Sequence, residues 1–230
     1  MALMSWIHRA PRLRVGRPLL FLLFCLLAVQ LSLNLLPDPT LLLDLCACSW
    51  QYLMQGKVWT ILSYALLHHP SDWSHFLLNS VGLLFFFGRI AHIFSPLMAY
   101  RILLSGILAG AGLHLLSGLL VPALDAPLIG LSGGLFALLA AYCTFSPTSI
   151  LWPLRLSAKN ALLGTALFSS ACLLYILLQA FAPLPTPPEL LVGMGHACHL
   201  GGLIAGALIA KWMIRIPQGL KKDRPKTRIV

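Results

Sequence analysis

Six long apolar stretches decide what this chain can fold into. Each contains about 20 residues, the length of an α-helix that spans the hydrocarbon core of a bilayer. Hydrophobic residues fill 59% of the 230 positions and charged residues only 10%, far more apolar surface than a soluble core of this size would bury. The sequence therefore predicts an all-α polytopic membrane protein, a six-transmembrane-helix bundle. The stretches lie at about 17–36, 73–94, 97–121, 129–146, 158–182 and 193–214.

The segments around these stretches suggest three parts. We expect a basic N-terminus at 1–16, a six-helix membrane domain at 17–214 and a basic tail at 215–230. The longest connection, at about 37–72, contains KVWTILSYALL, which is apolar enough to lie in the membrane interface. The first apolar stretch follows four arginines, as in a signal peptide, but it is long for one and lacks a small-x-small cleavage site. We therefore interpret it as a retained span.

The basic residues predict the orientation of the chain. With the N-terminus in the cytoplasm, 15 of the 16 lysines and arginines fall on the cytoplasmic side, and only Lys57 lies outside. This positive-inside bias predicts that both termini are cytoplasmic, and we expect the membrane to be the bacterial cytoplasmic (inner) membrane. The formal net charge of +10 then reflects topology and contact with the lipid bilayer. Nucleic acid is not the expected partner.

Polar residues inside apolar spans cost free energy and are therefore candidate functional residues. In the predicted topology the second, fourth and sixth spans run in the same direction, and each has polar side chains one to two turns from its outer end. We expect these side chains to converge, because a serine, a histidine and further donors are the groups that nucleophilic acyl transfer requires. They are His75 and Asn79, then Ser132, then His196 and His199.

Spacing along each helix supports this convergence. His75 and Asn79 are four residues apart and share a helix face, and Phe136 follows Ser132 by the same interval. None of the six acidic residues lies within a span, so a serine–histidine dyad is more natural than a triad. Burial disfavours the charged imidazolium, and we expect a neutral His199 that accepts the serine proton.

Glycines provide the close approach that such a dyad needs. His199, Gly202 and Gly206 share one face of the sixth span, which forms a small-xxx-small contact strip. Gly133, beside Ser132, allows the same close approach from the fourth span. His196 lies one turn nearer the outer end than His199, and we expect it to lie nearer the water.

The motifs GLSG at 130–133, HFLLN at 75–79 and ACHLGGLIAG at 197–206 resemble G-x-S-G, H-x-x-x-N and A-x-H-x-x-G-x-x-x-G of the rhomboid family of intramembrane serine proteases. Their order and the spans that carry them also match. The resemblance implies a rhomboid-like bundle that hydrolyses a peptide bond in or next to the transmembrane segment of single-span membrane protein substrates. It implies no cofactor and no metal.

The resemblance also implies roles for individual residues. Ser132 would be the nucleophile and His199 the base, while the Ser132 backbone N–H, His75 and Asn79 would form the oxyanion hole. Phe136 stands where family members usually have a tyrosine that stacks on the catalytic histidine. Thr60 follows Trp59 where the family often has Trp-Arg, which leaves the anchoring of the outer loop open. The glycines expected to support the site are Gly130, Gly133, Gly202 and Gly206.

Other interpretations remain open from the sequence. Ser132 could be a helix cap or a packing residue, and His75 and Asn79 could bind each other and nearby carbonyls. The protein could be a catalytically silent rhomboid-like protein that binds transmembrane clients, or a transporter, although paired repeats with broken helices are absent from the sequence. A metal site lacks a compact ligand motif and leaves Ser132 unexplained; its ligands would come from His68, His69, His75, His196, Cys198 and His199. We interpret His68 and His69 as loop residues, or as residues that support the site.

Overall fold

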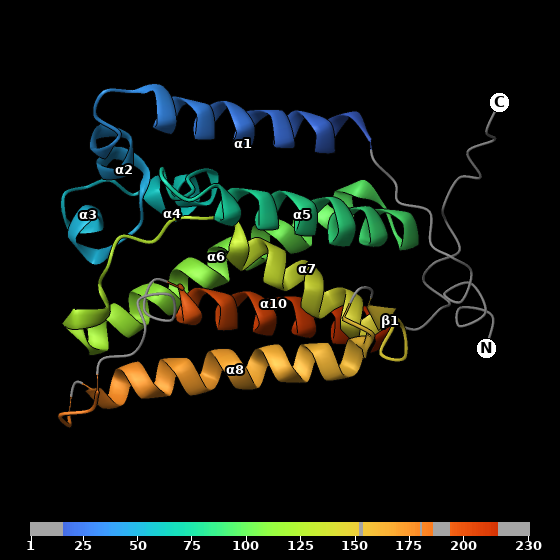
Figure 1. Ribbon diagram of the computed structural model, residues 1–230. Coiled ribbons are helices and arrows are strands. Elements are labelled where there is room, and N and C mark those ends of the chain that lie inside the picture. Colours follow the sequence, from blue (N-terminus) through green and yellow to red (C-terminus); the bar gives the residue numbers. More distant parts are fainter. Residues whose placement is uncertain (1–15, 152–153, 180, 186–193, 216–230) are drawn as a thin grey trace.

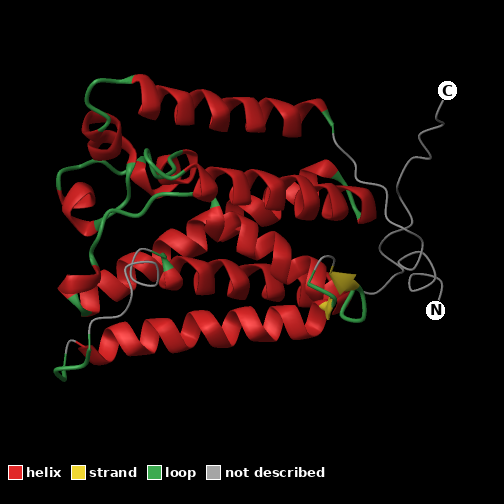
Figure 2. Ribbon diagram, viewed as in Figure 1, coloured by secondary structure: helices red, strands yellow, loops and turns green. Residues whose placement is uncertain are grey.

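The computed structural model describes residues 16–151, 154–179, 181–185 and 194–215. Helices lie roughly alongside one another in a bundle (Figures 1 and 2), which confirms the predicted all-α class. Five of them are long and apolar enough to cross a membrane, whereas α7 is shorter. The six main helices are α1 (Arg17–Leu35), α5 (Trp73–Ile93), α6 (Pro96–Leu120), α7 (Ser132–Phe145), α8 (Ala158–Gln179) and α10 (His196–Arg215).

The fourth span begins later than its apolar stretch predicts. The helix starts at Ser132 rather than near residue 129, because Gly130 has φ +112, a left-handed conformation that a continuing helix excludes. With 14 residues, α7 is only about 21 Å long at 1.5 Å per residue, and it begins near the middle of the bundle (Figure 1). Ser132 is therefore the first residue of α7. It lies deep in the bundle because this helix is short.

Helices α6, α7 and α10 pack closely at the centre of the bundle. A Cβ on Gly202 would collide with the carbonyl oxygen of Gly133, and one on Gly206 with that of Ala137. The backbones of α7 and α10 therefore touch directly, as the small-residue strip predicts. Helix α8 covers the outside of this pair, and α1 lies beside α5 at the other side of the bundle (Figure 1).

The segment between α1 and α5 is folded into short helices at one end of the bundle. They are α2 (Thr40–Cys46), α3 (Trp50–Met54), α4 (Thr60–Ser63) and the 3₁₀ turn η1 (Tyr64–Leu66). At the opposite end, β1 (Ile150–Leu151) pairs with β2 (Leu156–Ser157) in an antiparallel hairpin between α7 and α8. The 3₁₀ turn η2 (Pro122–Leu124) follows α6.

The segment between α1 and α5 also holds the residues that lead into α7. The Asp125 carboxylate accepts hydrogen bonds from the backbone N–H groups of Trp50 (2.7 Å) and Gln51 (3.2 Å) at the start of α3. Cys48 and Leu128 form an isolated antiparallel bridge, with N–H to carbonyl distances of 3.0 and 2.8 Å. Hydrogen bonds from the segment between α1 and α5 therefore fix residues 125–130, which lead into Ser132.

Candidate active site

Ser132 and His199 lie in hydrogen-bond contact. The Ser132 Oγ is 3.0 Å from His199 Nε2, and the two residues are only 8% and 7% exposed. They come from the first turns of α7 and α10, whose backbones meet at Gly133 and Gly202. The N-cap of α7 is Leu131, and Ser132 is the first residue of the helix. The helix-cap interpretation of Ser132 is therefore wrong.

The His199 ring is held by aromatic stacking. Phe136, one turn below Ser132 on α7, lies parallel to the imidazole with ring centroids 4.2 Å apart and an interplanar angle of 18°. This contact fixes the plane of the ring while Nε2 faces the serine. The phenyl ring does so without the hydroxyl of a tyrosine.

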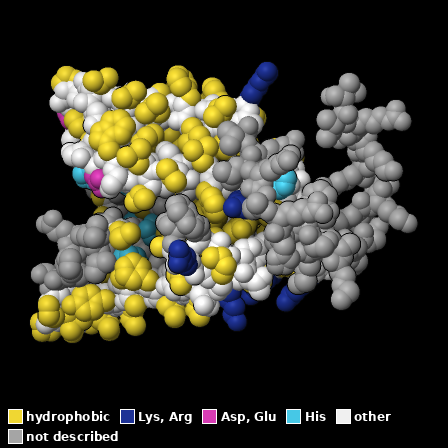
Figure 3. All heavy atoms as spheres, turned by 45° about the vertical axis from the view of Figure 1, so that its right-hand side comes forward, with side chains coloured by type: hydrophobic (Ala, Val, Ile, Leu, Met, Phe, Trp, Pro, Cys, Tyr) yellow, Lys and Arg dark blue, Asp and Glu magenta, His cyan; other side chains and the backbone are white. Residues whose placement is uncertain are grey.

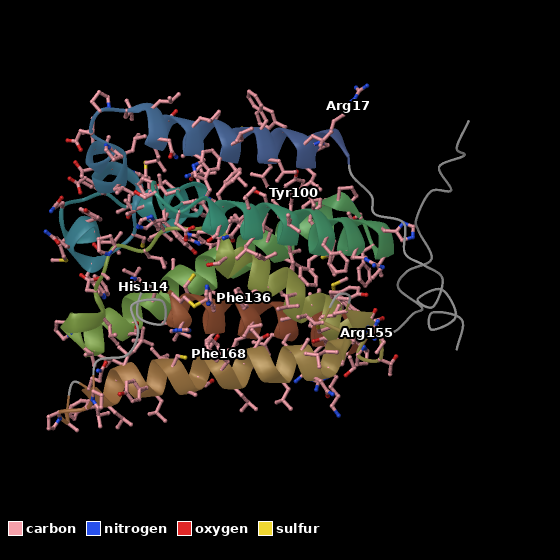
Figure 4. All side chains as sticks on the ribbon, in the orientation of Figure 1. Arg17, Tyr100, His114, Phe136, Arg155 and Phe168 are labelled. Carbon is pink, nitrogen blue, oxygen red and sulfur yellow. The ribbon has the colours of Figure 1, made fainter. Side chains whose placement is uncertain are left out.

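His196 does not lie at the water-facing mouth that its register predicts. It is only 3% exposed, and Phe168 on α8, which Figure 4 labels, packs edge-on against it with centroids 5.8 Å apart. Its ring also meets the His199 ring edge-on at 6.1 Å. The expectation failed because sequence register gives the depth of a residue but does not reveal which neighbouring helix covers it.

His75 lies close to the serine, and Asn79 lies one turn below it on α5. A Cβ on Gly130 would lie 2.8 Å from the His75 ring and 3.9 Å from Ser132 Oγ, so both side chains border the space that this glycine leaves open. The Asn79 amide donates to the His75 carbonyl oxygen at 2.8 Å. That bond is the local pairing that the sequence left open, and the Asn79 Oδ1 atom is buried without a hydrogen-bond partner in the described chain.

His68 is a neighbour of the site that the sequence identified only as a loop or supporting residue. It is 0% exposed, and its ring packs edge-on against those of His75 (5.1 Å) and Phe76 (5.6 Å). Burial, and to a lesser extent the nearby His75, lowers the pKa of His68 to about 4. The neighbouring His69 instead accepts a bond from Gln30 on α1 through its carbonyl oxygen, at 3.2 Å.

The candidate metal ligands do not gather around one point. Within the described ranges, no group of three or more His, Cys, Asp or Glu side chains is arranged to hold a metal ion. Cys198 is fully buried, with its Sγ 3.7 Å from the Tyr64 hydroxyl. Ser132 and His199 are the pair in hydrogen-bond contact at the start of α7 and α10.

The fold and this pair define a class of protein: an apolar helical bundle with a buried serine–histidine pair near one end of its central helices. A family model, the Rhomboid domain, matches residues 55–216, well over half of the chain. The chain therefore belongs to the rhomboid family and is an integral multi-pass membrane protein, as the motifs implied. A search of curated proteins finds no match.

Proposed function

We propose that the protein is an intramembrane serine endopeptidase that uses a Ser132–His199 dyad. The observation that carries the proposal is the buried 3.0 Å contact between Ser132 Oγ and His199 Nε2. A neutral imidazole in contact with a hydroxyl is the arrangement of a general base and its nucleophile. The stacked Phe136 ring keeps the imidazole oriented for this transfer.

In this mechanism His199 Nε2 takes the Ser132 proton as Oγ attacks the scissile carbonyl carbon. The resulting imidazolium then gives that proton to the leaving amine, and an acyl-enzyme ester forms on Oγ. Water, deprotonated by the same nitrogen, hydrolyses the ester and restores the serine hydroxyl. One base therefore serves both halves of the reaction, and no acidic residue is required.

The developing oxyanion needs donors beside Ser132. Backbone N–H groups at the start of α7 point out of the helix and carry partial positive charge. The His75 ring is next to Gly130 and adds a side-chain donor. The Asn79 amide joins this set only if it exchanges its His75 carbonyl partner for the oxyanion. We infer that this exchange accompanies substrate binding.

Family membership supports membrane-embedded partners, and we propose single-span membrane proteins as the substrates. A helix hides its carbonyls in i to i−4 hydrogen bonds, so the cut segment must unwind before Ser132 attacks. Glycine or proline near the cut lowers that cost. By resemblance to the family, the substrate approaches sideways from the lipid between α5 and α8.

We also propose the orientation that the charges predict, with both termini cytoplasmic in a bacterial inner membrane. Among the described basic residues, Arg17 and Arg155 lie at the end of the bundle opposite the short helices between α1 and α5 (Figure 4). Other basic residues belong to 1–15 and 216–230, outside the described ranges. The proposed basic N-terminus at 1–16 and tail at 215–230 would then face the cytoplasm.

Cleavage of a reporter transmembrane protein by the purified chain in liposomes tests this function. Ser132→Ala and His199→Ala should abolish cleavage, while exposed counterparts, Ser170→Ala on α8 and His92→Ala on α5, should retain it. Continued cleavage by Ser132→Ala would refute the dyad. If wild type binds the reporter without cleaving it, the catalytically silent client-binding function is supported. Loss of cleavage with a chelator would instead support metal dependence.

A further inference from the structure

Arg89 carries a charge that the proposed catalytic function does not use. It lies 16 residues after the start of α5, about 24 Å along the helix from the end that carries His75. The side chain is half-buried, and its Nε and Nη1 atoms are buried without a hydrogen-bond partner in the described chain. Burying a cation without such partners is costly.

Aromatic rings surround part of this guanidinium. Its central carbon lies 4.7 Å from the ring centroid of Phe85 on α5 and 5.9 Å from that of Tyr142 on α7. These rings hold the guanidinium against the junction of the two helices. They offer no anionic oxygen, and so the N–H donors still lack an acceptor.

The described chain has no counter-charge near Arg89. Its acidic residues are at the other end of the bundle, in or beside the short helices and the loop that leads into α7. In Figure 3 the visible acidic side chains lie at the left edge, whereas lysines and arginines lie at the centre and right. The described acids are Asp38, Asp44, Asp72 and Asp125.

We propose that Arg89 binds the phosphate of an anionic phospholipid at the junction of α5 and α7. A guanidinium presents a planar set of N–H donors that matches two phosphate oxygens. The protein is embedded in a bilayer, and anionic headgroups are attracted to the membrane face where basic residues gather. Because Nε and Nη1 are buried in the structure, the guanidinium must turn outward from the two rings for a phosphate to reach these donors. The lipid phosphate then supplies both the acceptor atoms and the missing negative charge.

Native mass spectrometry of the full chain, released from phosphatidylcholine nanodiscs that contain phosphatidylglycerol, tests the site. Wild type should retain one phosphatidylglycerol about tenfold more strongly than Arg89→Gln. Arg89→Lys keeps the charge without the fork and should fall between them. Arg101→Gln removes an exposed cation from α6 and should retain lipid as wild type does.

Equal retention by wild type and Arg89→Gln would overturn the proposal. If Arg89→Gln does not fold, the comparison of wild type with Arg89→Lys decides, and equal retention by these two would overturn it. Inorganic phosphate added to protein in phosphatidylcholine alone distinguishes the source. Adducts of inorganic phosphate that depend on Arg89 and equal those of the lipid would show a soluble-anion site instead. Reporter cleavage has no part in this readout.

Discussion

Gly202 is the position where one added methyl group should separate the two halves of the proposed dyad. Its Cβ would collide with the carbonyl oxygen of Gly133, far inside the 3.0 Å that real Cβ atoms respect. That carbonyl belongs to the residue next to Ser132. Gly202→Ala therefore forces α10 away from α7 by about 1 Å, a displacement of a kind that costs on the order of 100-fold in catalytic rate. Overpacking should also lower the free energy of unfolding by about 1–3 kcal/mol.

Matched glycine variants separate the catalytic loss from the loss of stability. A Cβ on Gly206 meets the Ala137 carbonyl oxygen in the same way, one turn further from His199, so Gly206→Ala should destabilise the fold similarly and lose less activity. Gly112 on α6 has nothing within 4 Å of its Cβ position. Gly112→Ala should leave both quantities unchanged or raise stability by up to about 1 kcal/mol.

The assays are thermal unfolding in detergent and reporter cleavage in liposomes at matched folded fraction. Gly202→Ala should lose far more activity than Gly206→Ala. If Gly202→Ala instead unfolds and cleaves as wild type does, the two backbones are not in contact at this position.

Three further perturbations test separate contacts. Phe136→Tyr keeps the ring on His199 and should retain kcat/KM, whereas Phe136→Leu loses stacking worth about 0.5–1.5 kcal/mol and should lower kcat/KM about two- to tenfold; equal values would argue against a role for the stack. Asp125→Ala removes the acceptor for the start of α3 and should lower unfolding stability by about 1–3 kcal/mol, with Asp125→Asn between them, as thermal unfolding would show. Burial lowers the pKa of His68 in the folded protein to about 4, below the value of about 6.5 expected in the unfolded chain. The unfolded chain therefore takes up the proton first, and the free energy of unfolding falls as pH is lowered from about 6.5 to 4. His68→Phe should therefore lose less stability than wild type across that pH range in unfolding titrations. Identical slopes of the free energy of unfolding against pH would contradict the burial argument.

Hydrophobic length and motif spacing were enough to predict the helical bundle and the approach of two distant residues. Ser132 and His199 are 67 positions apart, yet the glycines on α10 and beside Ser132 indicated a close contact between their helices. Phe136 likewise reached the ring of His199, because a four-residue step on a helix returns to the same face. These features follow from helix geometry, which the sequence encodes locally.

Other features depend on contacts that no local pattern specifies. Residues 129–131 are as apolar as the helix that follows them, and α7 begins only at Ser132 because of the backbone conformation of Gly130. His196 is covered by Phe168 from a different helix. The Asp125 carboxylate meets the start of α3 across 75 positions. Tertiary packing decides each of these, so the sequence left them undetermined.

The most direct test of the proposed dyad is to locate a covalent adduct. Purified wild type is treated with a serine-reactive fluorophosphonate, and peptide mass spectrometry identifies the modified residue. The proposal predicts an adduct on Ser132 that disappears in Ser132→Ala and His199→Ala and persists in the His92→Ala control. An adduct on another serine, or undiminished labelling of Ser132 in folded His199→Ala, would contradict the assignment of His199 as the base that activates Ser132.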